Sequence, residues 1–165
     1  MEIINSKENK KVKEARKLFQ KKYRDKTGHY LIEGFHLLEE ALASNAEIVT
    51  IFVAASKADR VSADRMVVVS DDVLKTLSDE ETPQGVVAEV VKSLQSVDFS
   101  GNRYLVLENV QDPGNVGTLI RTADAAGFDT VICVGQTADI YSPKVLRSAQ
   151  GSTFHLSIQT YSELP

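Results

Sequence analysis

Residues 107–123 read LENVQDPGNVGTLIRTA, a segment that joins an apolar run to a helical pattern. A strand is expected at 103–108, where RYLVLE has the apolar character of strands buried in parallel sheets. A turn at Asp112 leads into a helix that is expected to run through Ala126. A second apolar strand is expected at 130–134. The segment therefore predicts a βαβ unit with parallel strands and a right-handed crossover.

Strands and helices are expected to go on alternating through the 103–165 region. Ser142 and Pro143 favour another helix start, with the serine as cap and the proline in the first turn. A third strand is expected at 154–158. The region then has three strands and two helices. An ordinary doubly wound sheet has about five strands. The sequence therefore predicts a parallel-sheet α/β domain that is incomplete at Pro165. Either a partner completes the sheet or the chain is a fragment, and a fragment is the favoured interpretation.

Residues 1–92 predict a different arrangement, a small mixed α/β sandwich. Asn5 or Ser6 is expected to cap a first, amphipathic helix. The elements expected next are a strand at 30–32, a helix at 34–42, strands at 48–54 and 65–70, a short helix at 71–77 and a strand at 86–91. In the 34–42 helix, Leu42 is expected to belong to the buried stripe. Residues 93–102 lack a sustained pattern and predict a linker.

The charge distribution is uneven along the chain. The net charge is −4, but the first 30 residues hold ten Lys or Arg against four acids, a balance of +6, and the remainder has a balance of −10. A strongly basic segment is tolerated more easily when it meets a polyanion, although basic helix surfaces also occur without any ligand. The candidate RNA contacts in this segment are Lys10, Lys11, Lys13, Arg16, Arg24 and Lys26.

Composition excludes several classes of protein. The apolar fraction of 42% and the charged fraction of 25% are typical of globular proteins. No apolar run approaches the roughly 20 residues that cross a bilayer, and the N-terminus has no secretory signal pattern. Cys133 is the single cysteine, so an internal disulfide and a multi-cysteine metal site are excluded, and a small core hydrophobe is expected. These features predict a cytoplasmic protein without a metal site.

The polar residues after the 103–108 strand occupy the position where open α/β sheets bind ligands. Arg121 lies in a helix that is otherwise apolar, so its guanidinium needs an RNA phosphate or a carboxylate as partner. A purely structural pair with Asp124 or Glu108 is the alternative. For Asn115 the alternative is a cap or turn residue without a ligand. The glycine spacing fits neither a Walker loop nor a dinucleotide-binding fingerprint.

The same segment resembles motif 1 of the SpoU/TrmH family of knotted RNA methyltransferases. That motif reads D-P-x-N-x-G, then R-T-A after three residues, and it stands here at 112–117 and 121–123. Residues 143–154 are similar to the family's P-K-x-x-R-x-S-x-G-x-x-F stretch, with a departure in the order of the small residues before the glycine. Residues 30–34 and 82–85 resemble parts of the substrate-binding domain that precedes the catalytic domain in many members. Four stretches thus agree, in order, with one two-domain architecture.

The resemblance implies an RNA substrate-binding domain at 1–92 and the first part of a SPOUT-type, trefoil-knot methyltransferase domain at 103–165. It implies transfer of a methyl group from S-adenosylmethionine to a ribose 2′-hydroxyl of ribosomal or transfer RNA, at a site formed across a homodimer. Asn115 and Arg121 match the motif 1 residues with catalytic roles, and Arg147 is a candidate RNA phosphate contact. Glu33 and its neighbouring glycine are expected to shape the first domain.

The sequence departs from the family in one respect. Motif 2, G-x-E-x-x-G, and motif 3, which contains S-L-N, are absent, so the cofactor-binding residues are expected beyond Pro165. This chain alone is therefore expected to bind S-adenosylmethionine weakly and to be inactive. Two alternatives are an RNA-binding module without catalytic activity and a small-molecule enzyme. The second lacks an evident nucleophile or metal cluster, since His29, His36 and His155 are scattered.

Overall fold

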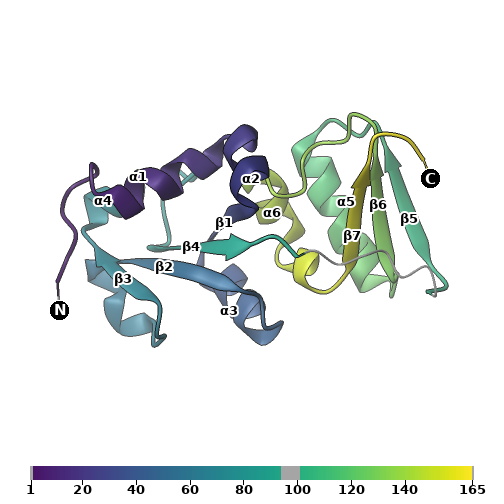
Figure 1. Cartoon of the computed structure of the whole chain (residues 1–165). Helices are drawn as coiled ribbons and strands as arrows, with labels where there is room; N and C mark the ends of the chain where they lie inside the picture. The colour runs from purple at the N-terminus through teal and green to yellow at the C-terminus, as the bar shows by residue number, and fades with distance from the viewer. Residues whose placement is uncertain (1, 94–100, 165) are drawn as a thin grey trace. The chain divides into compact units, whose positions relative to one another are not determined.

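The computed structural model describes residues 2–93 and 101–164 (Figure 1). By its internal contacts the chain divides into two compact units, Met1–Lys92 and Ser93–Pro165. The linker expected at 93–102 lies for the most part outside the described residues. No helix of the described residues is long and apolar enough to span a membrane.

The first unit is built on sheet A. Its strands are β1 (His29–Glu33), β2 (Ile48–Ala54), β3 (Met66–Val69) and β4 (Val86–Val91). They follow the order β1-β4-β2-β3, in which β4 is antiparallel to both neighbours and β2 runs parallel to β3. Beyond β3, Ile4 adds a single parallel bridge to Val69. The N-terminal segment therefore lies along the outer edge of β3.

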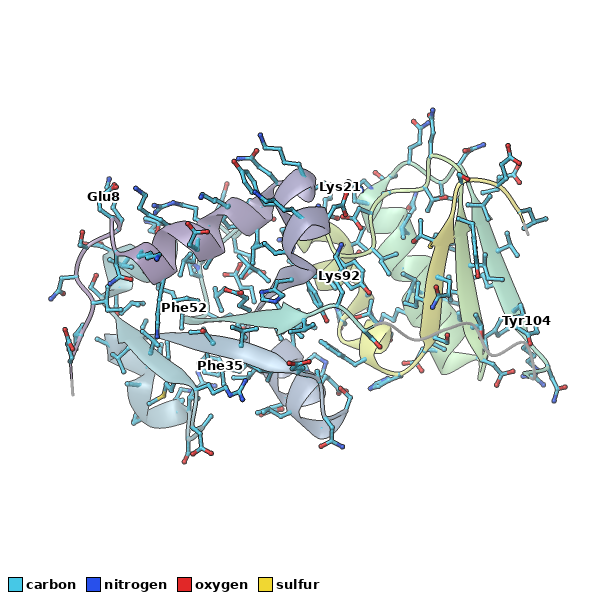
Figure 2. All side chains as sticks on the ribbon, in the orientation of Figure 1. Glu8, Lys21, Phe35, Phe52, Lys92 and Tyr104 are labelled. Carbon is cyan, nitrogen blue, oxygen red and sulfur yellow. The ribbon has the colours of Figure 1, made fainter. Side chains whose placement is uncertain are left out.

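Helices cover both faces of sheet A (Figure 1). One face carries α1 (Lys10–Arg16), the 3₁₀ turn η1 (Lys17–Phe19), α2 (Lys21–Thr27) and α4 (Asp71–Lys75), and the other carries α3 (Phe35–Ala43). A second 3₁₀ segment, η2 (Ala55–Arg60), follows β2. Phe52 of β2 is buried in one core with Val12 and Ala15 of α1, while Glu8 and Lys21 lie on the outer side of this layer (Figure 2).

Two expectations about the helices of this unit are wrong. The first helix does not begin at Asn5 or Ser6, because Asn9 is the cap: its side-chain oxygen accepts from the N–H groups of Lys11 and Val12. Its helical pattern is also interrupted, since Gln20 has an extended backbone between η1 and α2. Leu42, at the far end of α3, is 50% exposed rather than buried.

Arg24 explains how the chain accommodates this interruption. Its side chain is buried, and Nη1 donates to the carbonyl oxygens of Leu18 and Phe19, both at 2.9 Å. Carbonyls at a helix end lack intrahelical partners, and here a guanidinium supplies them. The expectation that Arg24 contacts RNA is therefore replaced by a structural role, because the group is enclosed and already engaged.

Arg24→Ala is expected to destabilise the first unit by about 3 kcal/mol, because it leaves two carbonyl groups without their charged donor in a buried setting. Lys26→Ala, on the exposed face of the same helix, is the matched control and is expected to change stability by less than about 0.5 kcal/mol. Urea unfolding followed by circular dichroism measures both. Equal stabilities of the two variants would contradict the structural role.

The second unit is built on sheet B, which is entirely parallel. Its strands are β5 (Tyr104–Glu108), β6 (Thr130–Val134) and β7 (Ser157–Tyr161), in that order. The connections are α5 (Pro113–Ala125), α6 (Pro143–Ala149) and the 3₁₀ turn η3 (Ser152–Phe154). The third strand thus begins later than the expected 154–158. The expectation of a first strand buried on both faces is also wrong, since Val106 is 42% exposed.

The helices of this unit pack at very close range. A Cβ on Gly117 of α5 would overlap the Ser148 hydroxyl of α6 and would lie 2.6 Å from the Val145 carbonyl oxygen. Only glycine therefore permits this approach of the two backbones. Cys133 is buried in the same core, and burial raises the pKa of its thiol to about 11. The prediction that it serves as a core hydrophobe is confirmed.

Candidate functional site

The carboxyl ends of β5 and β6 are joined by a hydrogen-bonded brace. Asn109, directly after β5, adopts a left-handed backbone with φ 54°. Its side-chain oxygen accepts from the Gln136 N–H at 2.8 Å, and the Gln111 amide donates to the Gln136 side-chain oxygen at 3.3 Å. A Cβ on Gly135 would collide with the Asn109 side chain. The loop after β6 therefore fixes the direction in which the chain leaves β5.

Thr137 adds a second connection. Its hydroxyl lies 2.8 Å from the carbonyl oxygens of Leu107 and Val134, one at the end of each strand. It also accepts from the Val110 N–H at 3.3 Å, and the Ala138 N–H donates to the Val110 carbonyl at 2.9 Å. The edge where an open α/β sheet binds ligands is thus held in place before any ligand arrives.

Asp112 begins α5 at this edge. Its carboxylate accepts from the Asn115 N–H at 2.8 Å, and Pro113 occupies the first helical turn. An acidic cap followed by proline is a favourable helix start, because the proline lacks only an N–H that would have no partner. Asn115 is therefore not the cap, and its own side chain is exposed. That amide is available to a ligand.

Arg121 lies further along α5 and is exposed. Among residues 2–93 and 101–164, its guanidinium makes no hydrogen bond or ion pair. The structural alternative is not realised, since Asp124 instead lies 2.7 Å from Nδ1 of His155. Asn115 and Arg121 are six positions apart, about 240° around the helix. One copy of α5 consequently does not direct both side chains at one point.

The structure places most of the predicted RNA contacts on the surface, whereas Arg16 is half-buried. Lys10, Lys11, Lys13 and Lys26 are exposed on α1 and α2, and Arg147 is exposed on α6. Lys13 is paired with Glu8 at 3.6 Å. The Arg16 guanidinium is partly engaged, because it donates to the Lys7 carbonyl at 2.8 Å and to the Thr76 hydroxyl at 3.2 Å.

Glu33 and Gly34 lie at a structural junction in the first unit. The Glu33 carboxylate accepts from the Ser78 hydroxyl in a short hydrogen bond and from the Asp79 N–H at 3.0 Å. The Gln84 side-chain oxygen accepts from the N–H that follows Gly34 and fills the space where a Cβ would be. The 78–85 loop is thereby fastened to the end of β1.

Burial raises the pKa of the Glu33 carboxyl above its ordinary value of 4.5. A raised pKa means that the folded state binds the proton more tightly than the unfolded state. The corresponding stability is present below pH 4.5 and is lost as pH rises through the folded-state pKa. Compared with Glu33→Gln, the wild type is expected to lose stability across that window. Urea unfolding of both proteins between about pH 4 and pH 7 measures this, and a parallel pH dependence would contradict it.

Family comparisons agree with this two-unit organisation. Residues 102–165 match the SpoU rRNA Methylase family, and residues 9–88 match the MRM3-like substrate binding domain. The second unit is a SpoU methylase domain. The resemblance drawn from motif 1 is thereby confirmed.

Named relatives support the same assignment. The chain is 42% identical over 161 residues to the 23S rRNA (guanosine(2553)-2′-O)-methyltransferase RlmP of Bacillus subtilis, covering 96% of this chain and 64% of the relative. It is 29% identical over 150 residues to the human mitochondrial rRNA methyltransferase 3, covering 82% of this chain and 36% of the relative. The chain thus spans less than two thirds of each relative.

Solved methyltransferase structures have the same fold. An rRNA methyltransferase from Sinorhizobium meliloti matches with a TM-score of 0.85 and 33% identity, covering 97% of this chain and 65% of that one. The SpoU methyltransferase AviRb of Streptomyces viridochromogenes, in complex with AdoMet, matches with a TM-score of 0.82 and 25% identity, covering 93% of this chain and 63% of that one. The predicted fold class, a mixed α/β unit followed by a parallel-sheet SPOUT methyltransferase unit, is confirmed.

Proposed function

We propose that the whole protein transfers a methyl group from S-adenosylmethionine to a ribose 2′-hydroxyl of ribosomal RNA. The observation that carries this proposal is the SpoU motif 1 at the braced edge of sheet B, in a chain 42% identical to a named rRNA 2′-O-methyltransferase. The first unit is proposed to bind the RNA, and the second to present the acceptor ribose. The cytoplasm is the proposed location, as for ribosomal RNA in a bacterium.

Within this reaction we assign Arg121 a role in charge stabilisation. Guanidinium stays protonated in proteins, so Arg121 does not remove the hydroxyl proton. It is suited to a phosphate of the bound RNA, which it can hold through two parallel hydrogen bonds. Positioning the acceptor in this way lowers the entropic part of the barrier. The RNA phosphate itself is the proposed acceptor of the 2′-hydroxyl proton, and Asn115 is proposed to shape the site around the ribose.

The described residues do not by themselves form a cradle for S-adenosylmethionine. At the edge of sheet B the side-chain oxygens of Asn109, Gln136 and Thr137 are already hydrogen-bonded to neighbouring groups of that edge. We therefore propose that residues other than these hold the methyl donor.

A homodimer is proposed to complete the site. Around a single α5 the side chains of Asn115 and Arg121 diverge, whereas a two-fold axis can bring Asn115 of one copy near the second copy's arginine. Light scattering of the full-length protein during gel filtration measures the mass. A monomer at working concentration would contradict this part of the proposal.

The reaction itself is tested with the full-length protein, tritium-labelled S-adenosylmethionine and ribosomal RNA from cells that lack the enzyme. Digestion of the product to nucleosides separates ribose methylation from base methylation. Label is expected in a 2′-O-methylated nucleoside, whose neighbouring phosphodiester resists alkali because the attacking hydroxyl is blocked. Label confined to methylated bases would refute the proposed function.

A second candidate is an RNA-binding module without catalysis. The exposed Lys10, Lys11 and Lys26 favour it, because none of them has an ion pair within the described part of the chain. It predicts RNA binding that weakens with salt, without methylation in the assay above. Salt-dependent binding together with methylation favours the enzyme instead.

A further inference from the structure

The first unit has a cavity at its outer edge. It has a volume of about 560 Å³ and is bounded by the N-terminal segment, the beginning of α1 and strand β3. This size is in the range of pockets that enclose small organic groups, about 300–1,000 Å³. Neither sequence motifs nor the family comparisons point to it.

One wall of the cavity combines apolar side chains with the outer edge of strand β3. Ile4 and Val67 are partly buried and pack against the core of the unit. The Ile4 N–H donates to the Val68 carbonyl at 3.0 Å, and the Ser70 N–H donates to the Ile4 carbonyl at 2.9 Å. Peptide groups of alternate residues point to the same edge of a strand, so those of Met66 and Val68 face the N-terminal segment. The wall therefore offers an apolar surface beside main-chain donors and acceptors.

The rim of the cavity has a net positive charge, because two lysines and a single acid, Glu2, line it. Lys10 and Lys11 line it, both are exposed, and neither has an ion pair among the described residues. On the same helical layer, by contrast, Lys13, Lys17 and Lys21 are each paired with a carboxylate, whereas Lys22 and Lys26 of α2 lie away from the cavity. Unneutralised positive charge is thus placed beside an apolar recess.

We propose that this cavity receives one unpaired nucleotide of the RNA, with its base against Ile4 and Val67 and its phosphate at Lys10 and Lys11. The inference rests on the proposed function, which makes RNA the ligand of this unit. An unstacked base has apolar faces and a polar edge, and its backbone carries the anion that the lysines lack. A base held in a duplex cannot enter, so the cavity selects single-stranded loops or bulges.

Glu2→Trp tests occupancy of the cavity. Glu2 lines it and is exposed, so a tryptophan there fills the space without touching the core. The change removes a negative charge, and electrostatics alone would strengthen RNA binding. Occlusion is expected instead to weaken binding of a fluorescein-labelled single-stranded RNA of about 12 nucleotides by about fivefold relative to Glu2→Gln. Fluorescence anisotropy measures this, and equal affinities of the two variants would overturn the proposal.

A second pair of variants tests the phosphate contact. Lys10→Ala with Lys11→Ala is expected to weaken binding of the same RNA by about tenfold and to lower the slope of log affinity against log salt by about 1.4. Lys22→Ala with Lys75→Ala removes the same charge from exposed positions of α2 and α4 and is expected to cost no more than about threefold. Equal losses in both pairs would show diffuse attraction and overturn the cavity assignment.

The remaining outcomes separate this inference from the proposed function. If the wild type bound neither single-stranded RNA nor duplex RNA, RNA binding by this unit would be refuted altogether. Equal affinity for single-stranded and duplex RNA would refute the cavity while leaving RNA binding intact. Guanosine 5′-monophosphate, used as competitor, would overturn the assignment to RNA if it bound as tightly as the oligonucleotide. Thermal melting of each variant confirms that the fold is retained.

Discussion

Arg121→Ala is expected to lower methyl transfer by the full-length protein by about a hundredfold or more, the usual effect of removing a group that stabilises charge in a reaction. Arg121 is exposed on α5 without a partner among the described residues, so the substitution should leave the fold intact. The dissociation constant for S-adenosylmethionine is expected to change by no more than about twofold, because the arginine is assigned to the RNA. Tritium transfer measures the first quantity and calorimetry the second.

Arg121→Lys is the matched variant for this experiment. It keeps the positive charge but loses the planar pair of donors, so it is expected to recover only part of the activity. Thr118→Ala, on an exposed position of the same helix, is the control and is expected to remain active. Equal losses of cofactor binding and methyl transfer in Arg121→Ala would contradict the assignment to RNA.

Mixing two inactive variants tests where the residues meet. If the site combines Asn115 of one copy with the other copy's Arg121, a mixture of Asn115→Ala and Arg121→Ala proteins contains heterodimers with one intact site. About a quarter of the wild-type activity is then expected after subunit exchange, because half of the dimers are mixed and each has one functional site of two. No recovery would place both residues in one chain's site.

Gly117→Ala is expected to destabilise the second unit by about 3 kcal/mol, because the added methyl group must enter a contact that is already full. It would overlap the Ser148 hydroxyl and lie 2.6 Å from the Val145 carbonyl oxygen and 2.8 Å from the Ala149 nitrogen. Alanine is the better helix former by about 1 kcal/mol, so the packing cost must exceed that gain. Urea unfolding with probes in the second unit measures the net effect.

Gly114→Ala is the matched control on the same helix. The nearest atom to its added Cβ would be an Asp112 carboxylate oxygen at 3.3 Å, on a side chain that can give slightly. It is expected to leave stability unchanged within about 1 kcal/mol. Adding Ser148→Gly to Gly117→Ala removes the side-chain overlap but not the contact with backbone, so partial recovery is expected. A stabilised Gly117→Ala protein would refute the close approach of α5 and α6.

Sequence patterns predicted the order of strands and helices well where apolar runs were unambiguous. The βαβ unit follows from two apolar strands and a helix with Asp112 at its start, and these elements appear within a few residues of their expected bounds. The patterns failed where a tertiary contact determines the local structure. The break at Gln20 depends on Arg24 reaching two carbonyls several residues earlier, and no local periodicity signals that. Leu42 likewise fits the buried stripe by its spacing, yet its side chain is 50% exposed.

The candidate site shows the same division. Motif 1 identified Asn115 and Arg121 by residue type and spacing, and their roles stay proposals. The brace of Asn109, Gln136 and Thr137 was missed, because its hydrogen bonds join residues 25 to 30 positions apart that meet only when β5 and β6 pair. Asn109 carried one usable signal, since asparagine directly after a strand tolerates a left-handed backbone better than most residues. The cavity beside β3 had none, because its walls come from three separate segments.

The all-parallel pairing of sheet B has a consequence for how the second unit folds. No two of its strands are joined by a tight turn, because α5 separates β5 from β6, and α6 and η3 separate β6 from β7. Each pairing must therefore close a long loop before its hydrogen bonds form, which slows parallel sheets relative to hairpins. Docking of α5 on α6 at Gly117 can speed these loop closures, because the two helices connect β5 to β6 and β6 to β7. Their contact therefore brings the three strands closer to one another before they pair. Refolding rate, as well as stability, then depends on the absence of one methyl group.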